Sequence, residues 1–183
     1  TADLIVKEME RSGGIISHED LKKYHSIWRE PVHGSYRGYD IWSMGPPSSG
    51  GVLLIQILNM LEQHDLSTLG WGSADTVHLM VEAKRRAYAD RAKHLGDPDF
   101  YAVPVETLIK KSYAKSRFAA VHLEQASNSN EIYPGKTPFT EGAETTHFSV
   151  MDKTGLMVAL TTTLNSSYGN KIVVPGTGML LNN

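Results

Sequence analysis

Residues 144–150, Glu-Thr-Thr-His-Phe-Ser-Val, begin the part of the chain that most constrains its fold. Phe148 and Val150 mark a strand in this stretch. A second apolar segment follows around Val158 and Leu160, and residues 152–155, Asp-Lys-Thr-Gly, predict a tight turn between the two. We therefore expect an antiparallel hairpin with hydroxyl groups gathered near one strand end.

Three residues at that end suggest a chemistry. Thr145 begins the first segment, and Thr163 and Asn165 follow the second. The group suits a threonine nucleophile whose base is its own α-amino group, released by cutting the bond after Glu144. Each residue taken singly is an ordinary strand or turn residue. His147 lies two positions from Thr145, and we expect it to have a structural role.

Composition and charge argue against several classes of function. The 183 residues suffice for a sizeable core, and a net charge of −2 without a basic block makes nucleic acid an unexpected partner. No apolar run reaches membrane-spanning length, so no membrane association is expected. The chain lacks cysteine, and its 8 histidines show no ligand spacing. We therefore expect neither a metal nor a cofactor.

Local signals predict several elements before residue 124. Gly13 should end a first helix, and Ser17 with Asp20 resembles a capping box. Ser73 should cap a long helix, and Pro104 should begin another. The expected elements are helices at 2–11, 17–24, 52–62, 74–94 and 104–120, and a hairpin of 28–36 with 39–44.

The loop at residues 45–51, Gly-Pro-Pro-Ser-Ser-Gly-Gly, has two readings. We favour a tight strand-to-helix connection in which a serine caps the following helix. A phosphate cradle is the alternative, but the P-loop lysine is missing and the glycine spacing differs.

The long helix at 74–94 is expected to bury one face. Seven side chains share that face by spacing, while most of its charged residues lie elsewhere. The expected packing residues are Val77, Met80, Val81, Lys84, Ala87, Tyr88 and Arg91. Residues 124–143, rich in Ser, Asn, Pro and Gly, read as a mobile loop or linker that leads to Thr145.

Several ordered motifs resemble the γ-glutamyltranspeptidase family, over almost the whole chain. They are Thr145-Thr146-His147 with Ser149-Val150, Thr163-Leu164-Asn165, Gly178–Asn183, Pro46–Gly51, Tyr88-Ala89-Asp90-Arg91 and Leu95-Gly96-Asp97-Pro98.

This resemblance implies an α+β fold that is part of an αββα N-terminal-nucleophile hydrolase sandwich. It implies a zymogen that cuts itself between Glu144 and Thr145. Residues 1–144 would then end the large subunit, residues 145–183 would begin the small one, and the two would form a heterodimer. Bacterial members are usually periplasmic or secreted.

The resemblance also implies roles for the three site residues. Thr145 would be the nucleophile, Thr163 would support it through its hydroxyl, and Asn165 would help hold the substrate's α-amino group. The donor would be glutathione or a related γ-glutamyl amide, and the acceptor an amino acid, a peptide or water.

Other readings stay open. A related glutaryl or cephalosporin-type acylase and a catalytically inactive scaffold or binding fragment are the alternatives. Family members are much longer, so we expect this chain to be a fragment that is inactive and uncleaved by itself. Unpaired strand edges in such a fragment would favour self-association.

Overall fold

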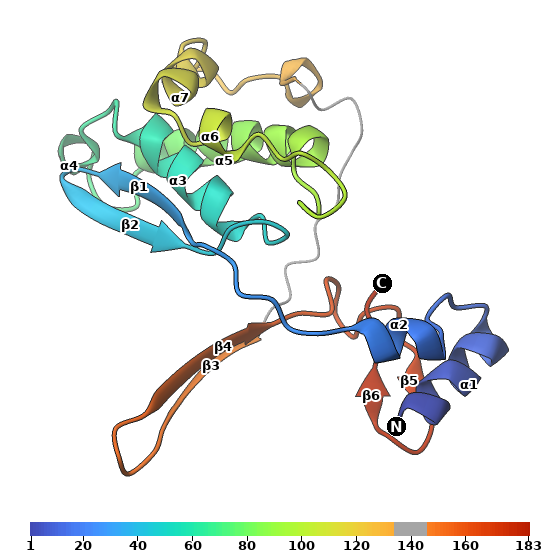
Figure 1. Ribbon diagram of the computed structural model, residues 1–183. Coiled ribbons are helices and arrows are strands. Elements are labelled where there is room, and N and C mark those ends of the chain that lie inside the picture. The colour runs from blue at the N-terminus through green and yellow to red at the C-terminus, as the bar shows by residue number, and fades with distance from the viewer. Residues whose placement is uncertain (134–145) are drawn as a thin grey trace. The chain divides into compact units, whose positions relative to one another are not determined.

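The computed structural model describes residues 1–133 and 146–183, which form two compact units (Figure 1). One unit contains residues 28–133, and the other combines residues 1–27 with residues 146–183. The described residues contain helices and two-stranded antiparallel sheets, which confirms the α+β class. The helices are α1 (Ala2–Ser12), α2 (His18–Lys23), α3 (Gly50–Leu61), α4 (Leu66–Leu69), α5 (Ala74–His94), α6 (Val105–Leu108), α7 (Lys111–Phe118) and the 3₁₀ helix η1 (Ser129–Glu131); the strands are β1 (Val32–Tyr36), β2 (Tyr39–Ser43), β3 (Thr146–Met151), β4 (Met157–Thr162), β5 (Val173–Val174) and β6 (Met179–Leu180).

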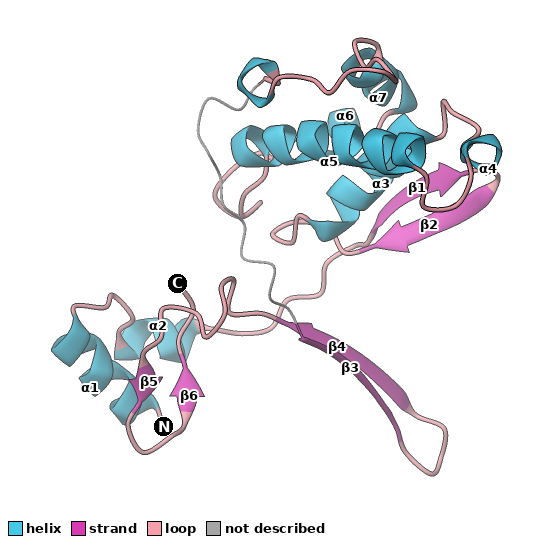
Figure 2. Cartoon of the chain, turned by 180° about the vertical axis from the view of Figure 1, so that it is seen from behind, coloured by secondary structure: helices cyan, strands magenta, loops and turns pink. Residues whose placement is uncertain are grey.

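In the unit of residues 28–133, helix α3 lies between the β1–β2 hairpin and α5 (Figure 2). The hairpin is the expected one, with Tyr36 opposite Tyr39. At Gly34 on β1, an added Cβ would lie 2.6 Å from Ile55 Cγ2, so this glycine lets the strand approach the helix closely. Two apolar clusters surround α3. The first contains Leu53, Met60, Leu61, Leu79, Ala83, Ala87, Ala114 and Phe118, and the second Val32, Val52, Ile55 and Leu108.

The start of α3 differs from the prediction. The helix begins at Gly50, two residues early. The Ser49 side chain does not cap it but accepts a hydrogen bond from Arg91 Nε at 2.9 Å, while the Ser48 hydroxyl accepts from the N–H of Gly50 at 3.3 Å. The Gly51 N–H donates to the Met44 carbonyl oxygen at 3.1 Å. A Cβ at residue 51 would lie 2.2 Å from that same oxygen. The glycine-rich loop is therefore shaped by close backbone packing between β2 and α3.

Helix α5 has the predicted bounds, and the Ser73 hydroxyl accepts from Thr76 N at 3.2 Å as a cap. Its predicted packing face is wrong in the first half of the helix, although Ala87 is buried and Tyr88 packs against the first cluster as predicted. Val77 is 50 % exposed, and Met80 and Val81 are each 46 % exposed. The buried side chains are Leu79, Glu82, Ala83, Arg86, Ala87 and Asp90. The spacing of apolar residues did not predict this face, because the face includes the carboxylates of Glu82 and Asp90, which are buried in ion pairs with arginines.

The helix expected at 104–120 is divided into α6 and α7. Asn59 Nδ2, on α3, donates to the Ile109 carbonyl oxygen at 2.6 Å, and Lys110 has extended backbone (ψ 135°). In a continuous helix that carbonyl would accept from residue 113. The extended backbone at Lys110 interrupts the helix, and the Asn59 side chain supplies a hydrogen bond to the Ile109 carbonyl oxygen at the break.

The other unit joins the beginning of the chain to its last residues. Helix α1 ends at Gly13, which has a φ of 74°, and the Ser17–Asp20 capping box of α2 is present. Helix α1 contacts β5, and Ile5, Met9 and Val174 are buried. The expected final extended stretch is β6, which pairs with β5.

The predicted linker begins with an ordered stretch. Residues 124–133 contain η1, and hydrogen bonds join Ser127 and Ser129 to side chains of α5. The remainder of that predicted linker, residues 134–143, lies outside the described residues.

Candidate active site

Strands β3 and β4 form the predicted hairpin, with Thr146 opposite Thr162 at its open end. The turn is held by the Asp152 carboxylate, which accepts from Thr154 N at 2.8 Å and from Leu156 N at 3.1 Å. These hydrogen bonds, led by those from Thr154, lower the pKa of Asp152. Thr163 follows β4 directly.

The predicted nucleophile, Thr145, and Glu144, whose carbonyl it would attack, lie outside the described residues. The structure therefore leaves the expected closeness of the Thr145 and Thr163 hydroxyls untested. It does place the residues that follow Thr145 and precede Thr163 on paired strands.

Thr163 and Asn165 are brought together by a turn. The Asn165 N–H donates to Thr163 Oγ1 at 2.9 Å, and Asn165 adopts a left-handed backbone with a φ of 71°. Asparagine tolerates that conformation better than most residues. The next residue, Ser166, donates its N–H to Asn183 Oδ1 at 2.9 Å, which ties the turn to the end of the described chain.

An open pocket of about 520 Å³ lies at this end of the hairpin. Hydroxyl groups from both strands and from the following turn line it, so it can offer several hydrogen bonds to a polar ligand. Its lining residues are Thr146, Thr162, Thr163, Leu164, Ser166, Ser167 and Tyr168.

His147 has a neighbour on the facing strand. Its Nδ1 lies 2.7 Å from Thr161 Oγ1, and its Nε2 lies 3.5 Å from Ser149 Oγ. A histidine in such cross-strand contacts supports the hairpin itself, in line with the structural role expected for it.

Elsewhere, sequence reasoning missed two buried acids on α5 and the partners that hold them. Asp90 accepts from Gln56 Nε2 at 2.5 Å and from the Tyr113 hydroxyl at 3.0 Å, and it pairs with Arg117 at 3.0 Å. Burial and the neighbouring Asp90 raise the pKa of Tyr113 to about 12. In the sequence, the motif Tyr88-Ala89-Asp90-Arg91 marked this part of α5, but nothing in that motif predicts that Asp90 is buried.

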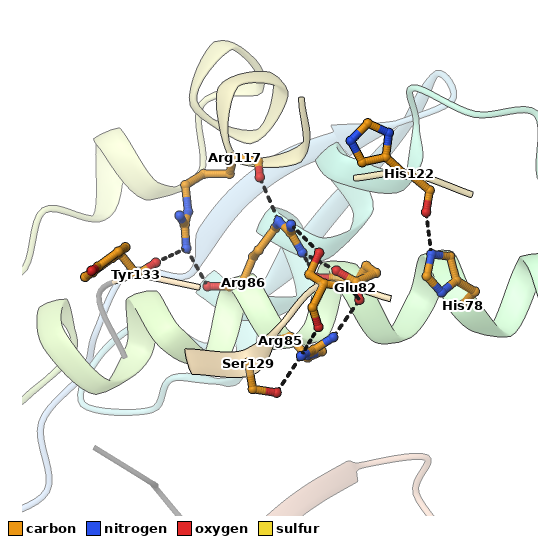
Figure 3. Close-up of polar contacts among 9 residues, drawn as sticks. His78, Glu82, Arg85, Arg86, Arg117, His122, Ser129 and Tyr133 are labelled. Carbon is orange, nitrogen blue, oxygen red and sulfur yellow. Dashed lines mark hydrogen bonds and ion pairs between the residues drawn. The ribbon is translucent and has the colours of Figure 1, made fainter. Parts of the chain in front are cut away.

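Glu82 is the second buried acid on this helix, with its side chain 1 % exposed. It pairs with Arg86 at 2.5 Å and with Arg85 at 2.6 Å (Figure 3). Burial by itself would raise the pKa of Glu82, but hydrogen bonds from Ser127 and Arg86 and the charge of Arg85 lower it to about 2. The carboxylate is thus ionised and fully paired at neutral pH.

Within residues 1–133 and 146–183, no group of three or more histidine, aspartate or glutamate side chains is arranged to hold a metal ion. None of the helices described is both long and apolar enough to span a bilayer.

Solved structures with this arrangement come from transpeptidases and acylases. The γ-glutamyltranspeptidase of Helicobacter pylori is 52 % identical, with a TM-score of 0.67 over 78 % of this chain and 41 % of that chain. The cephalosporin acylase of Bacillus halodurans is 26 % identical, with a TM-score of 0.73 over 99 % of this chain and 31 % of its own. The chain accordingly contributes part of an N-terminal-nucleophile hydrolase fold of the αββα type.

The family model for γ-glutamyltranspeptidase matches residues 1–183, and the chain belongs to that family. A glutathione hydrolase proenzyme of Escherichia coli (strain K12) is 50 % identical over 182 residues, which are 100 % of this chain and 31 % of that relative. An acylase ACY 1 proenzyme of Pseudomonas sp. (strain SE83) is 46 % identical, over 96 % of this chain and 31 % of that relative. The chain thus spans about a third of the length of these curated relatives.

Proposed function

We propose that this chain carries the cleavage site and nucleophile of a self-processing γ-glutamyltransferase and glutathione hydrolase. The observation that carries the proposal is the pairing of Thr146 with Thr162 beside a hydroxyl-lined pocket. Continuing that ladder by one pair would bring Thr145 opposite Thr163. The proenzymes among its relatives, named as glutathione hydrolases, support the same reading.

Self-cleavage needs one nucleophile and one water. The Thr145 hydroxyl adds to the Glu144 carbonyl carbon, and the peptide nitrogen leaves, which gives an ester on the threonine oxygen. Water hydrolyses that ester to the Glu144 carboxylate and restores the hydroxyl. The reaction frees the α-amino group of Thr145, so a residue within the precursor becomes the N-terminus of the smaller subunit.

Turnover then uses the same hydroxyl. The freed α-amino group has a pKa of roughly 8, so it can accept the hydroxyl proton near neutral pH. Thr145 attacks the γ-glutamyl amide of glutathione or a related donor, and the amine leaves as a γ-glutamyl ester forms on the threonine. An amino acid, a peptide or water takes the γ-glutamyl group from that ester.

Thr163 and Asn165 have supporting roles in this proposal. The Thr163 hydroxyl accepts a hydrogen bond from the Asn165 N–H. A hydroxyl can donate as well as accept, and in this proposal the Thr163 hydroxyl donates to the Thr145 oxygen. In this proposal the Asn165 side-chain oxygen accepts from the α-amino group of the substrate.

Substitution of Thr145 in the complete precursor tests the proposal. Thr145→Ala should abolish both the appearance of two subunits on a denaturing gel and the release of a chromogenic amine from a γ-glutamyl anilide. Thr145→Ser should retain both reactions at a reduced rate, since it keeps a hydroxyl. Thr107→Ala, which changes an exposed threonine on α6, is the matched control. A Thr145→Ala precursor that still separates into subunits and turns over would remove this residue from the mechanism.

The acylase relatives support a second candidate, in which the transferred group is glutaryl rather than γ-glutamyl. The two donors differ by the α-amino group that Asn165 is proposed to bind. Comparing kcat/KM for γ-glutamyl and glutaryl anilides decides between them. Turnover of neither donor by a correctly cleaved protein would favour the inactive scaffold.

We place the mature protein in the periplasm or outside the cell, as a heterodimer of the two cleavage products. The family membership supports this placement. Fractionation of the native host, followed by detection of both subunits, tests it: material confined to the cytoplasm would contradict it.

A further inference from the structure

The turn after β4 contributes to the pocket and has a strained backbone. Residues 166–168 line the pocket at the open end of the β3–β4 hairpin, and Asn165 comes directly before them. Asn165 and Tyr168 both have left-handed backbones, with φ of 71° and 61°. Such conformations are costly for residues other than glycine and persist where the surrounding structure holds them. The contacts that hold this turn therefore help to set the shape of the pocket.

The two peptide groups that flank Asn165 are each held by a side chain. The N–H of Asn165 donates to Thr163 Oγ1 at 2.9 Å. The N–H of Ser166, which belongs to the following peptide group, donates to Asn183 Oδ1 at 2.9 Å. Because each peptide group is planar, holding both of them restricts φ and ψ of Asn165 and with them the direction of its Cα–Cβ bond. The Asn183 side chain thus helps to orient Asn165.

Asn183 is itself supported by the packed part of this unit. Residues 181–183 follow β6 directly, β6 pairs with β5, and β5 contacts α1 (Figure 1). The Leu181 backbone adds two hydrogen bonds to the same turn. Its carbonyl oxygen accepts from the Asn170 N–H at 3.1 Å, and its N–H donates to the Ile172 carbonyl oxygen at 3.1 Å. These two bonds hold the far end of the turn, whereas Asn183 holds the end next to β4.

We propose that Asn183 is a positioning residue for the donor: by holding the Asn165–Ser166 peptide group, it keeps the Asn165 side chain where it accepts from the donor's α-amino group. This inference rests on the function proposed above. In this role Asn183 contacts the turn and not the donor. Its loss should therefore weaken the binding of a donor that has an α-amino group and should leave the binding of a donor without that group unchanged.

The test compares two donors in the complete protein with Asn183→Ala, after maturation. A typical hydrogen bond contributes a net factor of roughly 5 to an equilibrium constant. The KM for a γ-glutamyl anilide should therefore rise roughly 5-fold, while kcat stays close to the wild-type value. A glutaryl anilide lacks the α-amino group, so its apparent affinity, measured as a substrate or as a competing inhibitor, should stay at the wild-type value.

Three further variants separate this role from general damage. Asn183→Asp keeps an acceptor oxygen for the Ser166 N–H, so its KM for the γ-glutamyl anilide should stay below that of Asn183→Ala. Asn183→Ser has a hydroxyl that ends short of the Ser166 N–H, and it should repeat the alanine result if the alanine variant does not fold. Asn170→Ala is the matched control. It removes a side-chain hydrogen bond of the same length, from the Ile172 N–H to Asn170 Oδ1 at 2.9 Å, and should leave both affinities unchanged.

Hydrogen exchange tests the contact between Asn183 and the turn directly. The Ser166 amide loses its acceptor in Asn183→Ala, so it should exchange roughly 5-fold faster there than in the wild type. In Asn183→Asp and in Asn170→Ala the same amide keeps an acceptor at position 183, and its exchange should match that of the wild type. This measurement needs no substrate, so it is independent of the activity assay.

Each result decides the inference. An equal loss of affinity for both donors would overturn it, as would unchanged exchange at Ser166 in Asn183→Ala or faster exchange without a change in KM. A wild-type protein that turns over neither donor, or only the glutaryl one, would overturn the proposed γ-glutamyl activity and this role together. If the wild type is active on the γ-glutamyl donor and Asn183→Ala keeps the wild-type KM for it, only the role of Asn183 fails.

Discussion

Two adjacent glycines at the start of α3 should respond in opposite ways to the same substitution. At Gly50, which is exposed, the atom nearest to an added Cβ is Ser48 Oγ at 3.5 Å. At Gly51, the added Cβ would lie 2.2 Å from the Met44 carbonyl oxygen and 2.7 Å from Val32 Cγ2. The first is ordinary contact, while the second requires β2 and α3 to separate.

The magnitudes follow from these distances. Gly50→Ala should stabilise the helix by about 0.5–1 kcal/mol, because alanine loses less backbone entropy than glycine. Gly51→Ala should cost about 1–3 kcal/mol for the forced displacement, and roughly 1 kcal/mol more if the hydrogen bond from Gly51 N to Met44 O is lost. Gly50→Ala should therefore be more stable than the wild type, and Gly51→Ala less stable.

Hydrogen exchange in the complete protein measures the local stability of α3 in the two variants. Amides of Leu53 to Ile57 on α3 should exchange roughly 30-fold faster or more in Gly51→Ala, which corresponds to about 2 kcal/mol of lost protection, and no faster in Gly50→Ala. Equal damage from both substitutions, or none from Gly51→Ala, would refute the assignment of this loop to close packing.

Three further predictions concern the buried acids of α5 and Gly169, a second glycine whose backbone packs closely against another part of the chain. The pKa of Glu82 is lower in the folded protein than in the unfolded chain, so its contribution to stability is present above about pH 4.3 and is lost as the pH falls toward 2. Acid denaturation of Glu82→Gln should show a weaker pH dependence in that window. Tyr113→Phe should cost about 1 kcal/mol in urea unfolding, because Asp90 keeps its other partners. Gly169→Ala should disrupt the turn after β4, seen as faster exchange at the Asn170 amide, since an added Cβ would lie 1.9 Å from the Leu181 carbonyl oxygen.

Local sequence signals were enough for the elements whose ends are set by local chemistry. The Ser17–Asp20 capping box, the Ser73 cap and the stop at Gly13 each act within one turn of helix. The turn at residues 152–155 likewise carries its own hydrogen bonds, through the Asp152 carboxylate. These elements have the predicted positions because no distant residue is needed to form them.

Contacts between distant residues caused the errors. The break between α6 and α7 depends on Asn59, which is 50 residues from Ile109. The buried face of α5 depends on Arg117 and Ser127, which hold Asp90 and Glu82 from outside the helix. A helical periodicity treats every carboxylate as solvated, so it cannot find a face on which acids are buried with partners. For the site, the sequence predicted the hairpin, while the closeness of the Thr145 and Thr163 hydroxyls stays a prediction and the role of Thr145 a proposal.

The contact between α1 and β5 affects how strongly the two products of cleavage at Glu144–Thr145 would stay associated. Ile5 and Met9 precede the Glu144–Thr145 bond and Val174 follows it, yet all three are buried in one unit. Leu4 also approaches the β5–β6 turn, where a Cβ on Gly176 would lie 3.4 Å from Leu4 Cδ1. Breaking the bond would make this contact intermolecular and therefore subject to mass action. Separation of the products would expose apolar surface on both, so burial of that surface would oppose their dissociation on dilution.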